Sequence, residues 1–215
     1  MTEKKIKPAE TSLYFITDDR RSMGRSAEET LAAAVAGGAR LAQFRPSGLS
    51  DAEFLRAARA LASIAAPAGC ALLLNDRADI ALAAGAAGVH LGRNDIPISD
   101  ARRILGSRAI IGYSAHDPAE AVAAQRDGAD FITYSPIFPT TSHSLPRPAV
   151  GARGLRDIID SARLTIPVFA LGGVGLEQIP ELKAAGVRRA AVVTAITEQP
   201  DMALAASRLI AALEG

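Results

Sequence analysis

The sequence is built from one repeated unit, in which an alanine-rich stretch leads through a glycine into a short apolar run that ends in polar residues. The unit is plainest at residues 36–45, 83–92, 126–136 and 184–194. A glycine after a helix can take the left-handed conformation that closes the last turn, and a continuous apolar run is typical of a parallel strand buried on both faces. The repeat therefore predicts helices that lead into parallel strands, which is the pattern of an α/β fold.

Applied to the whole chain, the same unit predicts eight strands with amphipathic helices between them. The strands are expected near residues 12–18, 41–45, 71–76, 88–92, 109–114, 131–136, 167–172 and 189–195. Helix starts are indicated by capping residues, namely Ser26, Ser50, the Asp117-Pro118 pair and the Pro200-Asp201 pair. Eight βα units in 215 residues fit a closed barrel better than an open sheet. We expect a single (β/α)8 TIM-barrel domain over residues 11–215, preceded by a flexible N-terminal tail over residues 1–10.

The composition excludes several classes of protein. Lys plus Arg (24) nearly equal Asp plus Glu (23), so no global field would attract nucleic acid or anionic lipid. The sequence shows neither the apolar core of a secretory signal nor about 18 uninterrupted apolar residues. The single cysteine, Cys70, has no disulfide partner in the chain, which suits a reducing compartment. We therefore expect a cytoplasmic protein with no nucleic-acid or membrane partner, and the sequence is compatible with a homo-oligomer.

Polar residues follow the predicted strands at the places where a barrel carries its chemistry. In a (β/α)8 barrel the working residues lie at the C-terminal ends of the strands. Such residues here are Thr17 to Asp19, Gln43, Arg45, Asn75, Asp76, Asp95, Ser114, His116, Ser135 and Thr194. The loop over residues 136–150 is too long and too polar to serve only as a connection. These features predict one functional site at the mouth of the barrel.

Two pairs of these residues suggest particular ligands. Asp76 and Asp95 end neighbouring strands, and their hard oxygen atoms suit Mg²⁺ bound together with substrate phosphates. Helix N-capping is the alternative role for each of them. Gln43 and Arg45 alternate with Phe44 and so share a face inside the barrel, where a buried guanidinium needs an anionic partner.

A glycine-rich turn follows the seventh predicted strand, at residues 172–175. Glycines let backbone N–H groups approach an anion closely, and phosphate binds in this quarter of many barrels. The turn therefore favours phosphate binding over the alternative of a merely tight connection. His90, which lies between two apolar strand residues, is expected to be a hydrogen-bonded histidine of the barrel interior and not a catalyst.

Six motifs in order along the chain resemble the thiamine phosphate synthase and TenI superfamily. They are LYFITD, QFR, LLLNDRADIALAAGAAGVHLG, IGYSAH, SPIFPTTSH and ALGGV, and the resemblance extends from about Leu13 to Ile210. It implies a transferase that joins hydroxymethylpyrimidine diphosphate to a thiazole phosphate, with release of diphosphate. The implied partners are these phosphorylated pyrimidine and thiazole substrates, and the implied cofactor is Mg²⁺.

The resemblance also implies a role for each matched position. Asp76 and Asp95 would hold Mg²⁺. The residues implied to contact the pyrimidine diphosphate are Gln43, Arg45, Asn75 and Ser114, and those implied to hold the thiazole phosphate are Thr140, Thr141, Ser142, Gly173, Val193 and Thr194. The candidate catalytic residues are Arg45, Ser114, His116 and His143, the last also a candidate substrate-binding residue.

Two positions depart from the synthase pattern and keep alternatives open. Ser47 stands in place of the lysine of Gln-x-Arg-x-Lys, and His143 in place of the lysine of Thr-x-Thr-Lys. Both changes remove positive charge that would face a leaving diphosphate, although Arg147 could compensate. The TenI branch, whose members tautomerise a thiazole carboxylate phosphate, is the alternative, with His116 as its proton carrier. A third reading is a barrel that binds a phosphorylated thiamine precursor without turnover; the retained Asp76 and Asp95 favour the synthase.

Overall fold

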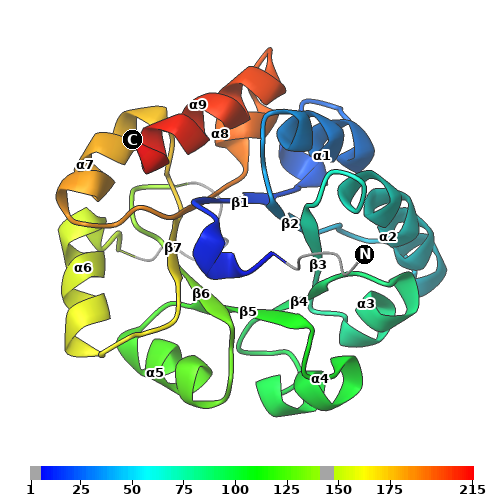
Figure 1. Ribbon diagram of the computed structural model, residues 1–215, viewed down its shortest axis with the longest axis horizontal. Helices are drawn as coiled ribbons and strands as arrows, with labels where there is room; N and C mark the ends of the chain where they lie inside the picture. The colour runs from blue at the N-terminus through cyan, green and yellow to red at the C-terminus, as the bar shows by residue number, and fades with distance from the viewer. Residues whose placement is uncertain (1–5, 141–147) are drawn as a thin grey trace.

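The computed structural model describes residues 6–140 and 148–215 and shows a closed parallel barrel (Figure 1). Its strands are β1 (Leu13–Ile16), β2 (Leu41–Phe44), β3 (Ala71–Asn75), β4 (Gly88–Leu91), β5 (Ile110–Ala115), β6 (Phe131–Tyr134), β7 (Val168–Leu171) and β8 (Ala190–Val192). They follow one another in chain order, and β1 pairs in parallel with β8 to close the ring. The predicted (β/α)8 barrel is confirmed, as are all eight strands; seven are shorter than predicted, and β5 has the predicted length but is shifted by one residue.

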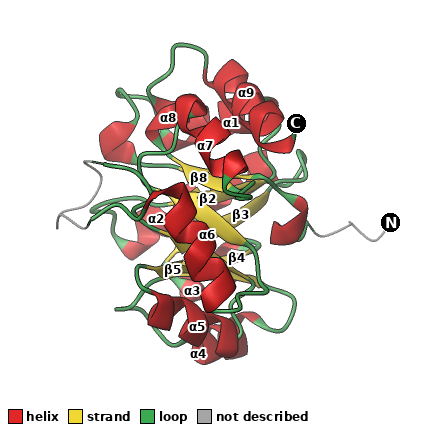
Figure 2. Cartoon of the chain, turned by 90° about the vertical axis from the view of Figure 1, so that its left-hand side faces the viewer, coloured by secondary structure: helices red, strands yellow, loops and turns green. Residues whose placement is uncertain are grey.

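Helices surround the strands on the outside of the barrel (Figure 2). They are α1 (Ala27–Ala36), α2 (Asp51–Ala65), α3 (Ala78–Ala84), α4 (Ile98–Leu105), α5 (Pro118–Arg126), α6 (Gly151–Ser161), α7 (Ile179–Ala184), α8 (Thr194–Thr197) and α9 (Met202–Glu214). Within residues 6–140 and 148–215, none of them combines the length and the hydrophobicity needed to cross a membrane.

The four predicted helix starts are confirmed by their capping hydrogen bonds. The Ser26 and Ser50 side chains each accept a hydrogen bond from the backbone N–H three residues later. The Glu29 and Glu53 carboxylates in turn accept from the backbone N–H of Ser26 and Ser50, which completes a capping box at each helix. Asp117 caps α5 and Asp201 caps α9 in the same way. The repeated glycine also behaves as expected: Gly85 closes α3 in the left-handed conformation, at φ 70°.

The N-terminal segment differs from the predicted tail of residues 1–10. Pro8–Glu10 form a 3-10 helix, η1, in which Pro8 is buried, and Ile6 packs against the apolar cluster inside the barrel. This helix lies across the barrel end that faces the viewer in Figure 1. The apolar side chains at that end need cover, so at least residues 6–10 belong to the folded domain.

The barrel interior has an apolar layer made largely of aromatic rings. Tyr14, Phe131 and Phe169 are fully buried and meet edge to face, with ring centroids 5.1 to 5.9 Å apart. The second apolar cluster lies between the strands and the helices, and residues such as Leu13 and Phe15 point into it. Successive strand residues therefore serve the two cores alternately.

A layer of polar side chains lies beside the aromatic rings. His90 is buried, with Nδ1 3.2 Å from the Tyr14 hydroxyl and Nε2 3.0 Å from the Ser114 hydroxyl. Thr133 joins the same network, 3.3 Å from His90 Nε2 and 3.4 Å from Ser114 Oγ. Burial, with a smaller effect of the Arg45 charge, lowers the pKa of His90 to about 3. The histidine is neutral and hydrogen-bonded, as the sequence predicted.

We expect the buried His90 to make the protein less stable as the pH falls. The unfolded histidine takes up a proton near pH 6.5, but the folded one does so only near pH 3. The unfolded state therefore binds more protons between these values, and His90 should lower the unfolding free energy by up to about 1.4 kcal/mol per pH unit.

Urea titrations of the wild type and His90→Gln at pH 4, 5, 6 and 7 measure this effect. The difference between the two unfolding free energies should change with pH between pH 4 and pH 6 and level off towards pH 7. Parallel curves throughout would show that the folded histidine titrates normally.

Gly112 leaves the space that His90 and Phe131 occupy. A Cβ atom at this position would lie 2.4 Å from His90 Nδ1 and 2.4 Å from the Phe131 ring. Gly112→Ala should therefore destabilise the protein by about 1–3 kcal/mol through overpacking. Denaturant unfolding measures the change.

Gly154→Ala provides the matched control. A Cβ at Gly154, within α6, would make an ordinary contact of 3.4 Å, so this variant should be as stable as the wild type or more so. Equal stability of both variants would contradict the proposed tight packing around His90.

Candidate active site

The predicted mouth is a real cavity at the C-terminal ends of the strands. A space of about 690 Å³ is enclosed by the ends of β1, β7 and β8 together with residues of the adjoining loops. Its lining includes Arg21, Arg45, Thr140, Gly172, Gly173, Val193 and Thr194. The structure therefore brings Arg45 and four residues predicted to hold a phosphorylated thiazole around one cavity.

Asp76 and Asp95 lie in contact with each other at the ends of neighbouring strands. Partial burial, a hydrogen bond to Asp95 and the Asp95 charge together raise the pKa of Asp76 to about 7. Arg45 and Asn75 act in the opposite direction, and Asn75 Nδ2 donates to Asp76 Oδ2 at 2.5 Å. Two carboxylates held side by side in this way favour a shared proton or a bound cation.

Neither carboxylate caps a helix, so the alternative role is wrong for both. The residue before α3 is Arg77, the residue before α4 is Pro97, and neither helix has a side-chain cap. The Asp95 carboxylate instead accepts from the backbone N–H of Gly92 at 2.6 Å. Asp76 has a left-handed backbone, at φ 62°, a conformation that is uncommon outside glycine and concentrates at functional sites.

The carboxylate pair fits Mg²⁺ bound together with a phosphorylated ligand. Mg²⁺ prefers oxygen ligands, usually takes one or two carboxylates, and keeps the remaining positions for water and substrate phosphates. Among the described residues, no group of three or more histidine, cysteine or acidic side chains is placed to bind a metal. Asp76 and Asp95 would thus supply two ligands and leave the others to the substrate.

Arg45 lies at the rim of the mouth and not in the barrel interior. The strand ends at Phe44, so the Arg45 side chain is 41% exposed, and the prediction of a buried guanidinium is wrong. Its anionic partner is in the protein: Arg45 Nη2 lies 2.5 Å from Asp18 Oδ2. Its influence on the pKa of Asp76 places the same charge near the carboxylate pair.

Gln43 does point into the barrel, as predicted, and only 2% of it is exposed. Its Nε2 has no hydrogen-bond partner among the described residues, although the amide lies beside the Tyr14 hydroxyl and partly offsets the rise that burial causes in the Tyr14 pKa. An unsatisfied buried N–H costs about 1–3 kcal/mol. The Gln43 amide is therefore at most weakly hydrogen-bonded, with the Tyr14 hydroxyl beside it.

Ser114 and His116 come from the fifth strand and the residue that follows it. The Ser114 hydroxyl is held by His90 and Thr133 of the interior network. His116 Nδ1 lies 3.0 Å from the Ser135 carbonyl oxygen and 3.2 Å from the Ser135 hydroxyl oxygen, so Ser135 holds this side of the ring. The His116 backbone N–H donates to Glu120 at 2.7 Å, which fixes the residue at the start of α5.

The glycine turn after β7 packs against the loop after β6. Gly173 has φ 65°, and a Cβ there would lie 2.5 Å from the Pro139 carbonyl oxygen. Ile137 and Phe138 donate to the carbonyls of Leu171 and Gly172 at 2.9 and 3.0 Å. The N–H groups of Gly173 and Val174 donate to no other residue in the described part of the chain. The turn thus needs glycine for its shape and also presents free backbone donors.

Three predicted residues, Thr141, Ser142 and His143, lie outside the described residues, as does Arg147. Other parts of the site were missed in the sequence. The sequence indicates Asp18 only as a polar strand end and does not single out Tyr14 or Thr133. Alternation along each strand could have found Thr133, which lies two residues after Phe131 on the inward face.

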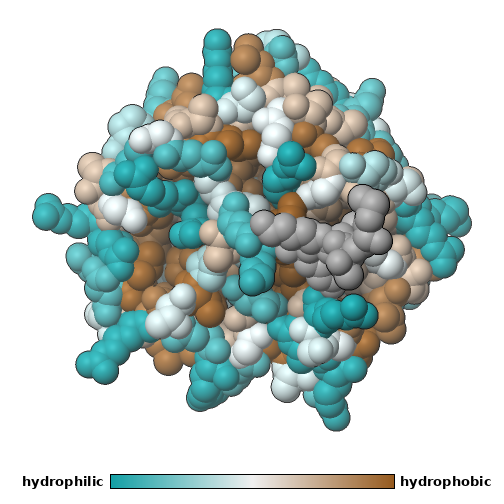
Figure 3. All heavy atoms as spheres, in the orientation of Figure 1, coloured by the Kyte–Doolittle hydropathy of each residue, from teal (hydrophilic) through white to brown (hydrophobic). Residues whose placement is uncertain are grey.

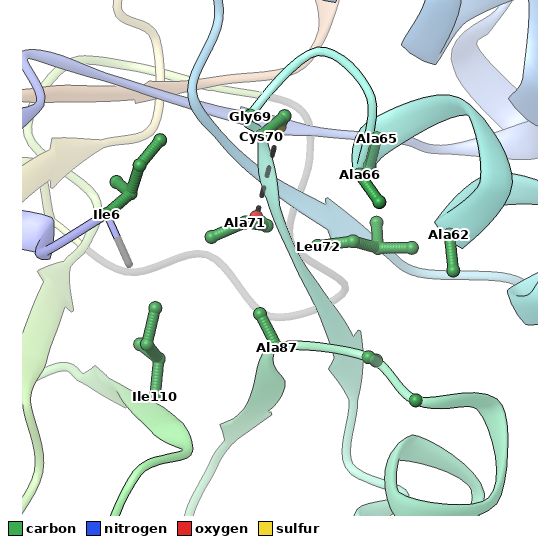
Figure 4. Close-up of a pocket in the computed structure, with 12 residues that line it drawn as sticks. Ile6, Ala62, Ala65, Ala66, Gly69, Cys70, Ala71, Leu72, Ala87 and Ile110 are labelled. Carbon is green, nitrogen blue, oxygen red and sulfur yellow. Dashed lines mark hydrogen bonds between the residues drawn. The ribbon is translucent and has the colours of Figure 1, made fainter. Parts of the chain in front are cut away.

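A second cavity, at the opposite end of the barrel, lacks the chemistry of the mouth. It has a volume of about 290 Å³ and lies at the N-terminal ends of β3 and β5 (Figure 4). Ile6, Leu72 and Ile110 line it, and its one reactive group, the Cys70 thiol, is directed at the Ala71 carbonyl. Burial raises the pKa of Cys70 to about 12, so the thiol is inert at neutral pH. In the space-filling view of this end, hydrophobic residues show in hollows between hydrophilic side chains (Figure 3).

Known proteins with similar sequences share nearly the whole chain. A putative thiamine-phosphate synthase of Geobacter sulfurreducens is 44% identical over 202 residues, covering 94% of this chain and 94% of that protein. The thiamine-phosphate synthase of Chloroflexus aurantiacus is 39% identical over 197 residues, covering 92% of this chain and 90% of that protein. Among solved structures, a thiamine phosphate pyrophosphorylase from Pyrococcus furiosus matches with a TM-score of 0.84 and 32% identity, covering 94% of this chain and 95% of that one.

These comparisons confirm the resemblance inferred from the motifs. The family described as thiamine monophosphate synthase matches residues 13–196, which include every described residue of the site. The chain therefore belongs to the thiamine monophosphate synthase family.

Proposed function

We propose that the protein is a Mg²⁺-dependent transferase that couples hydroxymethylpyrimidine diphosphate to a thiazole phosphate, forming thiamine phosphate and releasing diphosphate. One observation carries this proposal: the Asp76 and Asp95 carboxylates lie in contact at the mouth, beside the charge of Arg45. A pair of like charges is unfavourable without a cation and useful with a cation that binds a polyanion.

The residues at the second, third and fifth strands would bind the pyrimidine diphosphate. Arg45 and Asn75 lie beside the carboxylate pair and can donate to diphosphate oxygens. The Gln43 amide and the Ser114 hydroxyl lie deeper, where a pyrimidine ring offers nitrogen and amine groups to hydrogen-bond. Because His90 is neutral, it orients Ser114 without placing positive charge next to a ring that becomes cationic.

The remaining side of the cavity would hold the thiazole phosphate. The N–H groups of Gly173 and Val174 are directed at no other described residue, and Val193 and Thr194 line the same space. Backbone donors of this kind suit a phosphate monoester. Binding there would place the thiazole on the far side of the pyrimidine from its leaving group.

The chemistry needs charge stabilisation and positioning, and no nucleophile from the protein. Departure of diphosphate leaves positive charge on the pyrimidine methylene, which the thiazole nitrogen then attacks. Bound Mg²⁺ would neutralise the departing diphosphate, and Arg45 would add a charge-assisted hydrogen bond. The cavity walls hold the two substrates in line and so reduce the entropic part of the barrier.

The tautomerase reading remains as a second candidate because of His116. The imidazole follows the fifth strand at the mouth of the barrel, where Ser135 contacts its Nδ1, and a histidine in this place is a candidate proton carrier. A tautomerase has no use for two carboxylates in contact, whereas such a pair can hold Mg²⁺ together with a diphosphate. The Asp76–Asp95 pair therefore favours the coupling reaction.

The direct test is an assay of the purified protein with hydroxymethylpyrimidine diphosphate, thiazole phosphate and Mg²⁺, with the thiazole carboxylate tautomer assayed in parallel. Formation of thiamine phosphate supports the proposal. Isomerisation without coupling would contradict the proposed function and indicate a tautomerase. Binding without turnover would indicate a non-catalytic barrel.

Asp76→Asn and Asp95→Asn should each lower the Mg²⁺-dependent coupling rate by about 100-fold or more. Each change removes a charged ligand, and a loss of about 3 kcal/mol in charged interactions corresponds to roughly that factor. Initial rates over a Mg²⁺ titration measure the effect.

The matched control is Asp157→Asn, on the exposed surface of α6, which should keep its rate. Unfolding by urea should also show that neither site variant is less stable than the wild type, since each removes repulsion between two carboxylates. Full activity of both Asn variants would contradict the metal role.

A further inference from the structure

The loops after β1 and β2 are joined at the rim of the mouth by a contact between Arg20 and Ser47. Arg20 belongs to η2 (Asp19–Arg21), the 3-10 helix that follows the first strand. Its Nε donates to the Ser47 hydroxyl at 3.3 Å. Ser47 in turn donates to Asp19 Oδ2 at 2.6 Å. The guanidinium of Arg20 therefore lies directly beside the side chain at position 47.

One carboxylate positions Arg20 and Arg45 together. Asp18 caps η2 by accepting from the Arg20 backbone N–H at 3.1 Å, and its other oxygen binds Arg45 Nη2 at 2.5 Å. Asp18 is itself only 10% exposed at the side chain, so it forms a rigid anchor for both residues. The two guanidinium groups are thus carried by adjacent loops on the same side of the mouth.

We propose that Arg20 is a diphosphate-binding residue and supplies the positive charge that is missing at Ser47. This rests on the proposed function, because the leaving diphosphate is the anion that Arg20 would meet. In the synthase pattern the cation is the lysine of the second loop. Here Arg20 of the first loop would place a positive charge at the same part of the rim.

The charges around Arg20 agree with this assignment. The two loops carry the carboxylates of Asp18 and Asp19 and the guanidiniums of Arg20, Arg21, Arg25 and Arg45, which leaves two net positive charges. Asp18 is bound to Arg45, and Asp19 accepts from the Ser47 hydroxyl. A diphosphate would therefore enter a region of positive potential.

Serine at position 47 suits an arginine neighbour better than lysine would. Its hydroxyl accepts from Arg20 Nε, which leaves the terminal nitrogens to approach an anion as a planar fork. A lysine at position 47 would repel the guanidinium. Because Arg20 is exposed, its hydrogen bond adds little to folding, and its replacement should leave the fold intact.

The test measures the affinity of the full-length protein for inorganic diphosphate with Mg²⁺, by isothermal titration calorimetry. Arg20→Ala should weaken binding about 10-fold, the factor that corresponds to about 1.4 kcal/mol, and Arg20→Lys should retain most of the affinity. Ser47→Lys introduced into the Arg20→Ala protein should restore binding, because the charge returns at the same place from the other loop.

The matched control is Arg103→Ala, which removes the same charge from the outer surface of α4, where Arg103 is 80% exposed and pairs with Asp100. It should bind as the wild type does. An Arg20→Ala protein that binds as tightly as this control, or a Ser47→Lys change that restores nothing, would overturn the assignment.

The same variants separate failure of this assignment from failure of the proposed function. If the wild type binds Mg²⁺–diphosphate but forms no thiamine phosphate, the proposed function fails and the affinities still decide the role of Arg20. If coupling occurs and Arg20→Ala leaves both the affinity and the KM for the pyrimidine diphosphate unchanged, the function stands and the role of Arg20 is rejected.

Discussion

Pairing of β1 with β8 is the constraint on which the candidate site depends. This pairing places Tyr14 opposite Ala191 and closes the ring, so that all strands end at one mouth. An open sheet with the same strands would separate Asp76 on the third strand from Thr194 at the eighth by the full width of the sheet. Closure instead places the ends of both strands at the same mouth.

Closure also forces polar groups into the barrel, and the structure satisfies nearly all of them. His90 bonds to Tyr14 on one side and to Ser114 on the other, and burial keeps it neutral. A protonated imidazole there would be unfavourable, because the low-dielectric interior offers it no compensating charge. The exception is the Gln43 amide, which has no partner for its N–H among the described residues. A ligand that accepted a hydrogen bond from this N–H would offset the free energy that its burial costs.

The sequence predicted the fold well because the repeated unit is local. Capping at Ser26 and Ser50, the glycine at residue 85 and the apolar runs each depend on a few neighbouring residues. The number of repeated units, which is eight, then predicts a closed barrel. The site was harder to predict, since each contact joins segments far apart in the chain. Arg45 was expected to be buried, but the strand ends one residue earlier and Asp18, 27 residues away, binds it at the rim.

The role proposed for Arg20 implies that the same chemistry does not require each charge to come from the same position. A diphosphate responds to the positive potential at its oxygen atoms, and that potential depends on where the cationic groups lie and not on which loop carries them. Adjacent loops of a barrel end at the same mouth, so a guanidinium on the first loop and an ammonium on the second can reach one point. The contact of Arg20 with Ser47 places a cation there from the first loop. The absence of a lysine from a motif therefore does not by itself indicate a lost activity, because a cationic side chain on a neighbouring loop can produce the same positive potential at the diphosphate.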